Sequence, residues 1–244
     1  MKQFSYLGDV REVFGFCVFC GKDTQTKDHI ISKVFLDKPY PKELPTIGAC
    51  LKCNQSFSLD EEYLACLIEV TLNGSVEPES INREKVSRIL ERKPALVSKL
   101  RLAKQEINNR TYYSTEPKRV KNIVLKIARG LAAFELNQPM LDEPLKVSFI
   151  PLFTITGEER GSFEMLPEGT LWPEVGTRAF QRWAVDGEMD ESKWLNVQHG
   201  RFRFLTIFAE TTIIRMVIGE YLACEVVWDY SKNLSSIFLK LGED

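Results

Sequence analysis

Two pairs of cysteines, each with the spacing C-x2-C, constrain the fold of this 244-residue chain more than any other feature. Cys17 and Cys20 form the first pair, and Cys50 and Cys53 form the second. Two thiolates separated by two residues can face one ion from a tight turn, and two such turns complete a tetrahedral Zn²⁺ site. Gly21 follows the first pair, where such a turn favours glycine. We therefore predict a structural zinc site, with four buried cysteines that bind no metal as the alternative.

Composition and hydropathy place the chain among ordinary globular proteins. Its hydrophobic content of 44% is sufficient for a core without disulfides. No run of about 18 apolar residues could cross a membrane, and the N-terminus lacks the apolar segment of a signal peptide. We expect a cytoplasmic protein that has no membrane partner. The remaining cysteines, Cys66 and Cys224, are expected in the core, because free cysteine packs as a small hydrophobic side chain.

Three polar residues lie close in sequence to the cysteine pairs. Asp28 and His29 lie within the 29 residues that separate the pairs, and Asn54 follows the last cysteine directly. A site closed by four cysteines has no open position for chemistry, so any chemistry must come from residues that the zinc holds in place. The only other histidine, His199, is expected in a turn between strands.

The order C-x2-C, D-H-I, C-x2-C-N resembles the HNH endonucleases, which are also called ββα-metal or His-Me finger nucleases. It is most similar to their endonuclease VII-like branch, which has a four-cysteine zinc. The resemblance covers about residues 14–70. It implies a finger of two short strands and a helix that hydrolyses DNA phosphodiester bonds. The last histidine of the family name is missing here, and in this branch Asn54 takes its place.

The resemblance assigns a role to each polar residue. His29 is the general base that takes a proton from water, which suits an imidazole that titrates near neutral pH. Asp28 and Asn54 are ligands of one catalytic Mg²⁺ or Mn²⁺, a cation that prefers oxygen ligands. Neighbouring side chains on a strand point to opposite faces. Asp28 and His29 therefore need a local bend, or His29 acts across the phosphate from the metal, which is the arrangement in the family.

The helix predicted over residues 59–72 leaves two interpretations open for its first carboxylates. Ser58 and Glu61 fit the capping box S-x-x-E, which would make Glu61 and Glu62 structural or solvent-facing. If the helix instead runs through Asn54, these carboxylates lie on a similar face and support the catalytic metal.

Positive charge is concentrated in the middle of the chain. Residues 83–129 carry 14 Lys and Arg against 4 Asp and Glu, whereas the whole chain has a net charge of −2. Apolar spacing predicts helices over 81–109, broken at Pro94, and over 117–137, opening at Pro117. The basic side chains form either a solvated face or a contact with a nucleic-acid backbone. On the second helix, the basic side chains expected outside the apolar face are Lys118, Arg119, Lys121, Lys126 and Arg129.

From about residue 145 the pattern becomes that of strands, and this acidic part is expected to pack on the helices. Alternation of apolar and polar residues is clearest after Arg201. The predicted strands are Val147–Phe153, Gly161–Leu166, Arg178–Val185, Arg201–Glu210, Thr212–Ile218 and Cys224–Trp228.

Together these features predict an α+β protein in three parts: a zinc-stapled nuclease finger at 1–75, a basic helical segment at 76–140 and a strand-rich C-terminal domain at 141–244. The expected function is metal-dependent endonucleolytic hydrolysis of double-stranded DNA, with structural Zn²⁺ and catalytic Mg²⁺ or Mn²⁺. One alternative is a non-catalytic zinc module that binds nucleic acid or a protein, and another is an RNA-directed or toxin-like nuclease. A protein partner or a homo-oligomer stays open.

Overall fold

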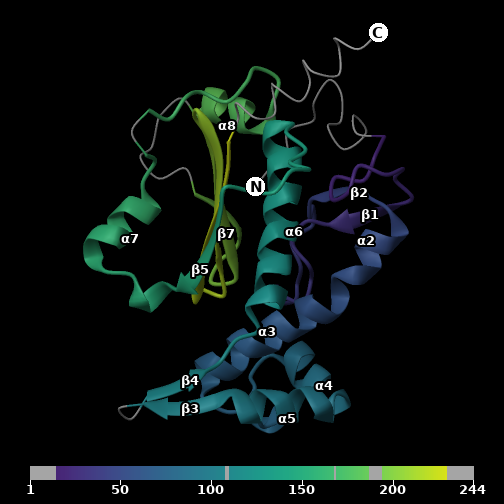
Figure 1. Ribbon diagram of the computed structural model, residues 1–244, viewed down its shortest axis with the longest axis vertical. Coiled ribbons are helices and arrows are strands. Elements are labelled where there is room, and N and C mark those ends of the chain that lie inside the picture. The colour runs from purple at the N-terminus through teal and green to yellow at the C-terminus, as the bar shows by residue number, and fades with distance from the viewer. Residues whose placement is uncertain (1–14, 108–109, 168, 187–193, 230–244) are drawn as a thin grey trace.

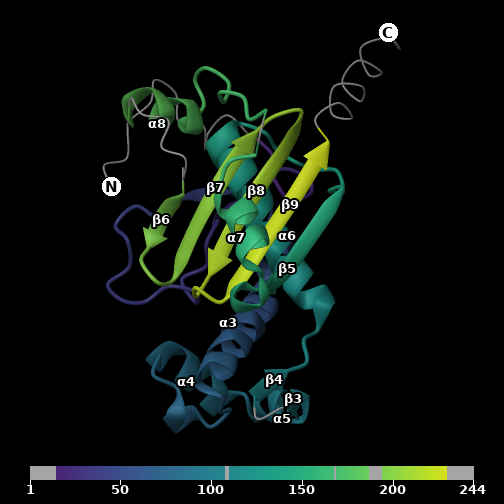
Figure 2. The ribbon, with the colours of Figure 1, turned by 90° about the vertical axis from the view of Figure 1, so that its left-hand side faces the viewer.

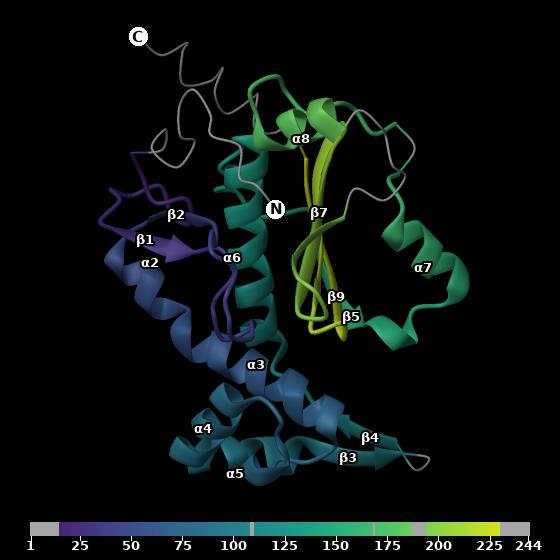
Figure 3. The same cartoon turned by 180° about the vertical axis from the view of Figure 1, so that it is seen from behind.

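The computed structural model describes residues 15–107, 110–167, 169–186 and 194–229, and the statements below concern these residues. Its elements are arranged around one long helix, α6 (Pro117–Leu136). Figure 1 shows an N-terminal hairpin on one side of α6 and a sheet on the other side, and Figure 3 shows the same order of layers from behind. The protein is therefore of the mixed α+β class that the sequence predicts. None of the helices in these ranges is long and apolar enough to cross a lipid bilayer.

The N-terminal part is a short antiparallel hairpin followed directly by two helices. Asp28 lies opposite Ile47 in the hairpin. The helix predicted over residues 59–72 is confirmed, and it ends at Gly74, where a positive φ of 69° favours glycine. The elements are β1 (Thr26–His29), β2 (Thr46–Ala49), α2 (Leu51–Ser56) and α3 (Ser58–Asn73).

The start of α3 differs from the predicted capping box. Phe57 occupies the N-cap position, and no side chain caps the helix there. Ser58 already lies in the helix, and its hydroxyl group donates to the backbone carbonyl of Gln55. The prediction is wrong because only Phe57 separates α2 from α3. Ser58 therefore lies inside the helix and does not take the extended backbone of a capping residue.

The middle of the chain is helical only in part. The predicted break at Pro94 is confirmed, because one helix ends at Arg92 and the next begins at Pro94. The predicted helix over 81–109 is wrong after residue 103, where Lys104 pairs with Tyr113 in a hairpin. Lys104–Ile107 offers little apolar surface for a helix to bury, whereas strand pairing satisfies its backbone groups. The elements are η1 (Pro78–Ser80), α4 (Glu84–Arg92), α5 (Pro94–Ala103), β3 (Lys104–Ile107) and β4 (Arg110–Tyr113).

Helix α6 begins at Pro117, as predicted, and most of its residues are buried. Burial on more than one side follows from its place between α3 and the hairpin on one side and the sheet on the other. Gly130 allows the chain after β1 to approach closely, since a Cβ atom at this position would lie 2.9 Å from the side chain of Ile30. This contact holds the end of β1 against α6.

The C-terminal sheet has the strand order β5-β9-β8-β7-β6, and every neighbouring pair is antiparallel. Figure 2 shows the face of the sheet that α7 covers, with α6 behind it. The predicted packing of this part on the helices is confirmed. The strands are β5 (Lys146–Pro151), β6 (Leu195–Gln198), β7 (Phe202–Phe208), β8 (Thr211–Ile218) and β9 (Leu222–Asp229).

Two of the predicted strands are helices. Gly161–Leu166 overlaps α7 (Gly157–Glu164), which follows the short η2 (Leu152–Thr154), and Arg178–Val185 lies in α8 (Arg178–Asp186). A capping box between Thr156 and Glu159 starts α7, a local signal that outweighs the short apolar run.

The three predicted parts are in contact with one another. Helix α6 lies in the middle part, yet it packs against α3 of the first part and against strands β5, β7, β8 and β9 of the last. The division into separate domains at residues 1–75, 76–140 and 141–244 stays a prediction. The predicted turn position of His199 is confirmed, since this residue lies between β6 and β7.

Candidate functional site

The four cysteines of the two C-x2-C pairs come together beside the hairpin and α2. Their Sγ atoms all lie within 4.8 Å of one another, and those of Cys20 and Cys50 are 3.8 Å apart. Sulfur atoms at the corners of a tetrahedron with Zn–S distances of about 2.3 Å are separated by roughly 3.8 Å. The cluster is therefore positioned to hold a metal ion and is consistent with a zinc site.

Backbone hydrogen bonds within each turn orient the two cysteine side chains of a pair toward the centre of the four-cysteine cluster. In the first turn, the N–H of Gly21 donates to the carbonyl of Cys17 at 2.8 Å, and Gly21 has the positive φ of 73° that the sequence predicts for this glycine. In the second turn, Cys50 is the N-cap of α2, and its sulfur accepts from the N–H of Cys53. This N–H lowers the pKa of Cys50 to about 7, whereas burial raises the pKa of Cys17.

Cys66 and Cys224 are buried away from this cluster, as predicted for core residues. Burial raises the pKa of the Cys66 thiol to about 12 and also raises that of Cys224. Both thiols therefore stay protonated near neutral pH, which is unfavourable for metal binding. They provide natural controls for substitutions within the cluster.

Asp28 belongs to a buried group of charges at the junction of β1, α3 and α6. The ammonium group of Lys126 on α6 lies 3.2 Å from Asp28 Oδ2 and 3.0 Å from Glu61 Oε1. The exposed fractions of these side chains are 0% for Lys126, 14% for Asp28 and 13% for Glu61. The Lys126 ammonium group also donates to the backbone carbonyl of His29 at 2.5 Å. We call Asp28, Glu61 and Lys126 the charge cluster.

The solvent-facing interpretation of Glu61 is therefore wrong, because this carboxylate points into the charge cluster. Glu62, the next residue, forms an ion pair with Lys93 instead. Burial raises the pKa of Asp28, and the nearby Lys126 ammonium group only partly opposes this effect. Two carboxylates thus converge on a single positive charge in a site largely shielded from water.

Asn54 lies on the same side of β1 as Asp28. Its side-chain amide nitrogen donates to Thr26 Oγ1 at 3.0 Å, and Thr26 is two residues before Asp28 on the strand. Side chains two positions apart on a strand point to the same face, about 7 Å from each other. Because the amide nitrogen of Asn54 is used by Thr26, the amide oxygen is the atom that remains for a cation.

His29 is the last residue of β1, so its side chain leaves the strand on the face opposite to Asp28. In the described part of the chain, no hydrogen bond joins its imidazole to Asp28 or Asn54, and its buried Nδ1 atom has no partner. Burial and the nearby Lys33 and Lys126 ammonium groups lower the pKa of His29. The structure thus brings Asp28 and Asn54 onto one face of β1, whereas His29 leaves the end of the strand on the other face.

Lys126 is the residue at this site that the sequence did not reveal. The prediction that Lys126 and Arg129 lie on outer faces of α6 is wrong: Lys126 is fully buried, and Arg129 donates to the carbonyls of Leu141 and Asp142. The sequence does contain a signal for the burial of Lys126, because this residue is three positions after Ile123 and so lies on the apolar stripe of the helix. Of the remaining basic side chains there, Arg119 pairs with Asp60. These ion pairs reduce the positive charge that α6 can offer to a polyanion.

No protein-family model, no curated protein and no solved structure matches the chain. The fold and site define a mixed α+β protein with a four-cysteine cluster suited to a metal ion, next to a buried charge cluster.

We expect the substitution Lys126→Met to destabilise the fold by about 3–5 kcal/mol, because it leaves two buried carboxylates without their cation. Denaturant unfolding measures the change in the free energy of unfolding. Lys118→Met, at an exposed position of the same helix, is the control and should change it by less than about 0.5 kcal/mol. Adding Glu61→Gln to Lys126→Met should recover part of the loss. A Lys126→Met variant as stable as the wild type would show that the ammonium group does not stabilise the carboxylates.

Proposed function

We propose that this chain is a metal-dependent endonuclease of the HNH type that hydrolyses phosphodiester bonds in DNA. The observation that carries the proposal is the position of Asp28, His29 and Asn54 relative to the cysteine cluster. Asp28 and Asn54 share one face of β1, and His29 ends that strand. Asn54 is also bonded directly to Cys53, so the metal cluster and the candidate catalytic residues belong to one small unit of structure.

Zn²⁺ is the proposed occupant of the cysteine cluster. Four sulfur ligands leave no open position, so its role is structural. Bound there, the ion would join the turn at Cys17 and Cys20 to the start of α2. It would thereby fix the orientation of Asn54 with respect to β1, because Asn54 follows the ligand Cys53 directly in the chain.

The donor set beside β1 fits a hard divalent cation such as Mg²⁺ or Mn²⁺. Asp28 and Asn54 would hold the cation, and Glu61 supplies a second carboxylate on the same side. All three donors are oxygen atoms, and Asp28 Oδ2 is buried with the Lys126 ammonium group as its ion-pair partner among the described residues. The cation would stabilise the negative charge that develops on the phosphate and on the leaving oxygen.

Proton transfer and the positioning of the metal ligands are assigned to residues of the chain. The imidazole of His29 takes the proton of the attacking water at Nε2, since Nδ1 is the buried ring nitrogen. The water oxygen bonds to phosphorus while the bond to the 3′ oxygen breaks, and the 3′ oxygen then receives a proton from solvent. By the family resemblance the products carry a 5′-phosphate and a 3′-hydroxyl. Lys126 acts as a positioning residue, because it holds Asp28 and Glu61 together.

Plasmid cleavage by zinc-containing protein tests the proposal. Cutting should require added Mg²⁺ or Mn²⁺ and should fall by about 10²-fold or more in Asp28→Asn, which removes a charged ligand. Asp23→Asn, at an exposed aspartate before the hairpin, is the matched control and should cut like the wild type. Cutting that is independent of divalent ions, or equal in the two variants, would reject Asp28 as a metal ligand.

One observation favours the alternative of a non-catalytic zinc module. The Lys126 ammonium group already pairs with Asp28 and Glu61 and offsets one of their two negative charges, which would weaken their attraction for a divalent cation. This alternative predicts that the folded, zinc-containing protein binds a nucleic acid or a protein and cleaves no substrate with any added ion. The cleavage experiment therefore separates the two functions.

A further inference from the structure

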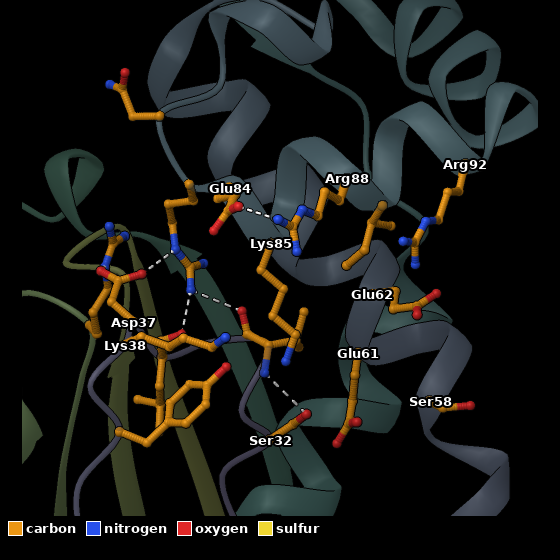
Figure 4. A pocket seen from close by; sticks show the side chains of 17 residues that line it. Ser32, Asp37, Lys38, Ser58, Glu61, Glu62, Glu84, Lys85, Arg88 and Arg92 are labelled. Atoms are coloured by element: carbon orange, nitrogen blue, oxygen red, sulfur yellow. Dashed lines mark hydrogen bonds and ion pairs between the residues drawn. The ribbon is translucent and has the colours of Figure 1, made fainter.

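A cleft of about 750 Å³ lies beside the charge cluster, between the chain after β1, the beginning of α3 and helix α4. Figure 4 shows Glu61 and Glu62 of α3 on one side of the cleft and the basic side chains of α4 on the other. The cleft therefore shares Glu61 with the charge cluster and is lined on its other side by a helix that the proposed mechanism does not use.

The charges that line this cleft are unbalanced. Each of its carboxylates already has an ion-pair partner among the described residues: Asp37, Glu61, Glu62 and Glu84. By contrast, three exposed cations of the cleft form no ion pair within the part of the chain that the structure describes: Lys38, Lys85 and Arg92. The cleft thus presents excess positive charge that is not neutralised by the protein itself.

The arrangement of α4 explains why its cations face the cleft. Val86 and Leu90 are buried and fix which side of the helix packs on the protein. Lys85 and Arg92 are seven residues apart, which is about two helical turns. They therefore lie on the same face of α4, and this face differs from the buried one. Figure 4 shows both side chains extending from α4 toward the side of the cleft that carries Glu61 and Glu62.

An aromatic ring lies among these cations. Tyr40 lines the cleft, with the ammonium groups of Lys33 and Lys85 at 5.7 and 5.9 Å from its ring centre. A positively charged groove combined with an aromatic side chain is typical of proteins that bind a single strand of nucleic acid. The volume also suits such a ligand, because pockets of roughly 300–1,000 Å³ enclose molecules of about the size of one or two nucleotides.

We propose that this cleft binds the phosphate backbone of a single-stranded segment of nucleic acid next to the bond that is cut. The inference rests on the proposed function for what happens to the strand, but binding in the cleft requires only the cations of the cleft. It narrows the substrate from DNA in general to DNA with single-stranded or unpaired segments.

Binding of a fluorescent oligothymidine of about 12 nucleotides, measured by anisotropy without divalent ions, tests the proposal. The double variant Lys85→Glu and Arg92→Glu should bind at least about tenfold more weakly, because each charged contact with phosphate contributes roughly a factor of ten. Its salt dependence should also fall, by about 1.4 in the slope of log affinity against log salt. Both positions are exposed, so the fold is expected to persist, and zinc content and circular dichroism verify it.

The matched control is Lys118→Glu with Lys121→Glu, which makes the same change in charge on α6. It should leave binding within about twofold of the wild type, and a larger loss there than in the cleft variant would overturn the proposal. A duplex of the same length should compete at least about tenfold less well than the single strand. Equal competition by the duplex would also overturn it.

The outcomes distinguish the cleft from the proposed catalysis. If the cleft variant loses binding but no protein cuts any DNA, the nuclease proposal fails and the binding site stands. If the wild type cuts DNA and the cleft variant binds and cuts equally well, the binding site fails and the nuclease proposal stands.

Discussion

Loss of the metal from the four-cysteine cluster is expected to unfold the N-terminal part of the protein. Within residues 15–57, the regular elements are two strands of 4 residues each and a helix of 6 residues. Elements of this length are not stable alone in water. Structural Zn²⁺ contributes an apparent binding free energy of about 10–16 kcal/mol in zinc-finger peptides, which is enough to determine whether such a unit folds.

Elemental analysis of the purified protein should therefore give one zinc per chain. Cys50→Ser should lose most of this zinc and lower the melting temperature, because Cys50 is both a ligand and the N-cap of α2. Cys66→Ala, at a buried cysteine outside the cluster, serves as the control and should keep its zinc although it leaves a small cavity. A wild-type protein without zinc, or full zinc occupancy in Cys50→Ser, would refute the assignment of the cluster.

Replacement of the candidate base has the largest expected effect on activity. We expect His29→Ala to reduce DNA cleavage by about 10²–10⁴-fold, the usual contribution of a general base. His29 lies at the end of β1 with its Nδ1 atom buried, and this atom has no hydrogen-bond partner among the described residues that the substitution could remove. The loss of activity should therefore exceed the loss of stability, which thermal unfolding measures separately.

The second histidine of the chain provides the matched control. His199 lies in the turn between β6 and β7, on the sheet rather than the hairpin, and His199→Ala should cleave DNA at the wild-type rate. If His29→Ala also retains full activity, the cleavage comes from another site or from a contaminant. If both variants lose activity together, a general effect on folding is the cause.

Much of the fold could be predicted from local patterns in the sequence. The helix over 59–72 and the start of α6 at Pro117 follow from the spacing of apolar residues and from the position of proline. The strands after Arg201 follow from alternation. The errors at α7 and α8 have a common reason, since a short apolar run fits a strand or a helix equally well until its surroundings are known.

The sequence by itself determined the cysteine cluster, because the spacing within each C-x2-C pair aims two sulfur atoms at one point and the glycine after the first pair permits its turn. Only the tertiary structure decided the rest of the site. Lys126 is 97 residues away from His29 in the chain, yet its ammonium group reaches the end of β1. Burial of that lysine depends on α6 being covered on two sides, by α3 and the hairpin and by the sheet, and no local pattern in one helix specifies two such partners.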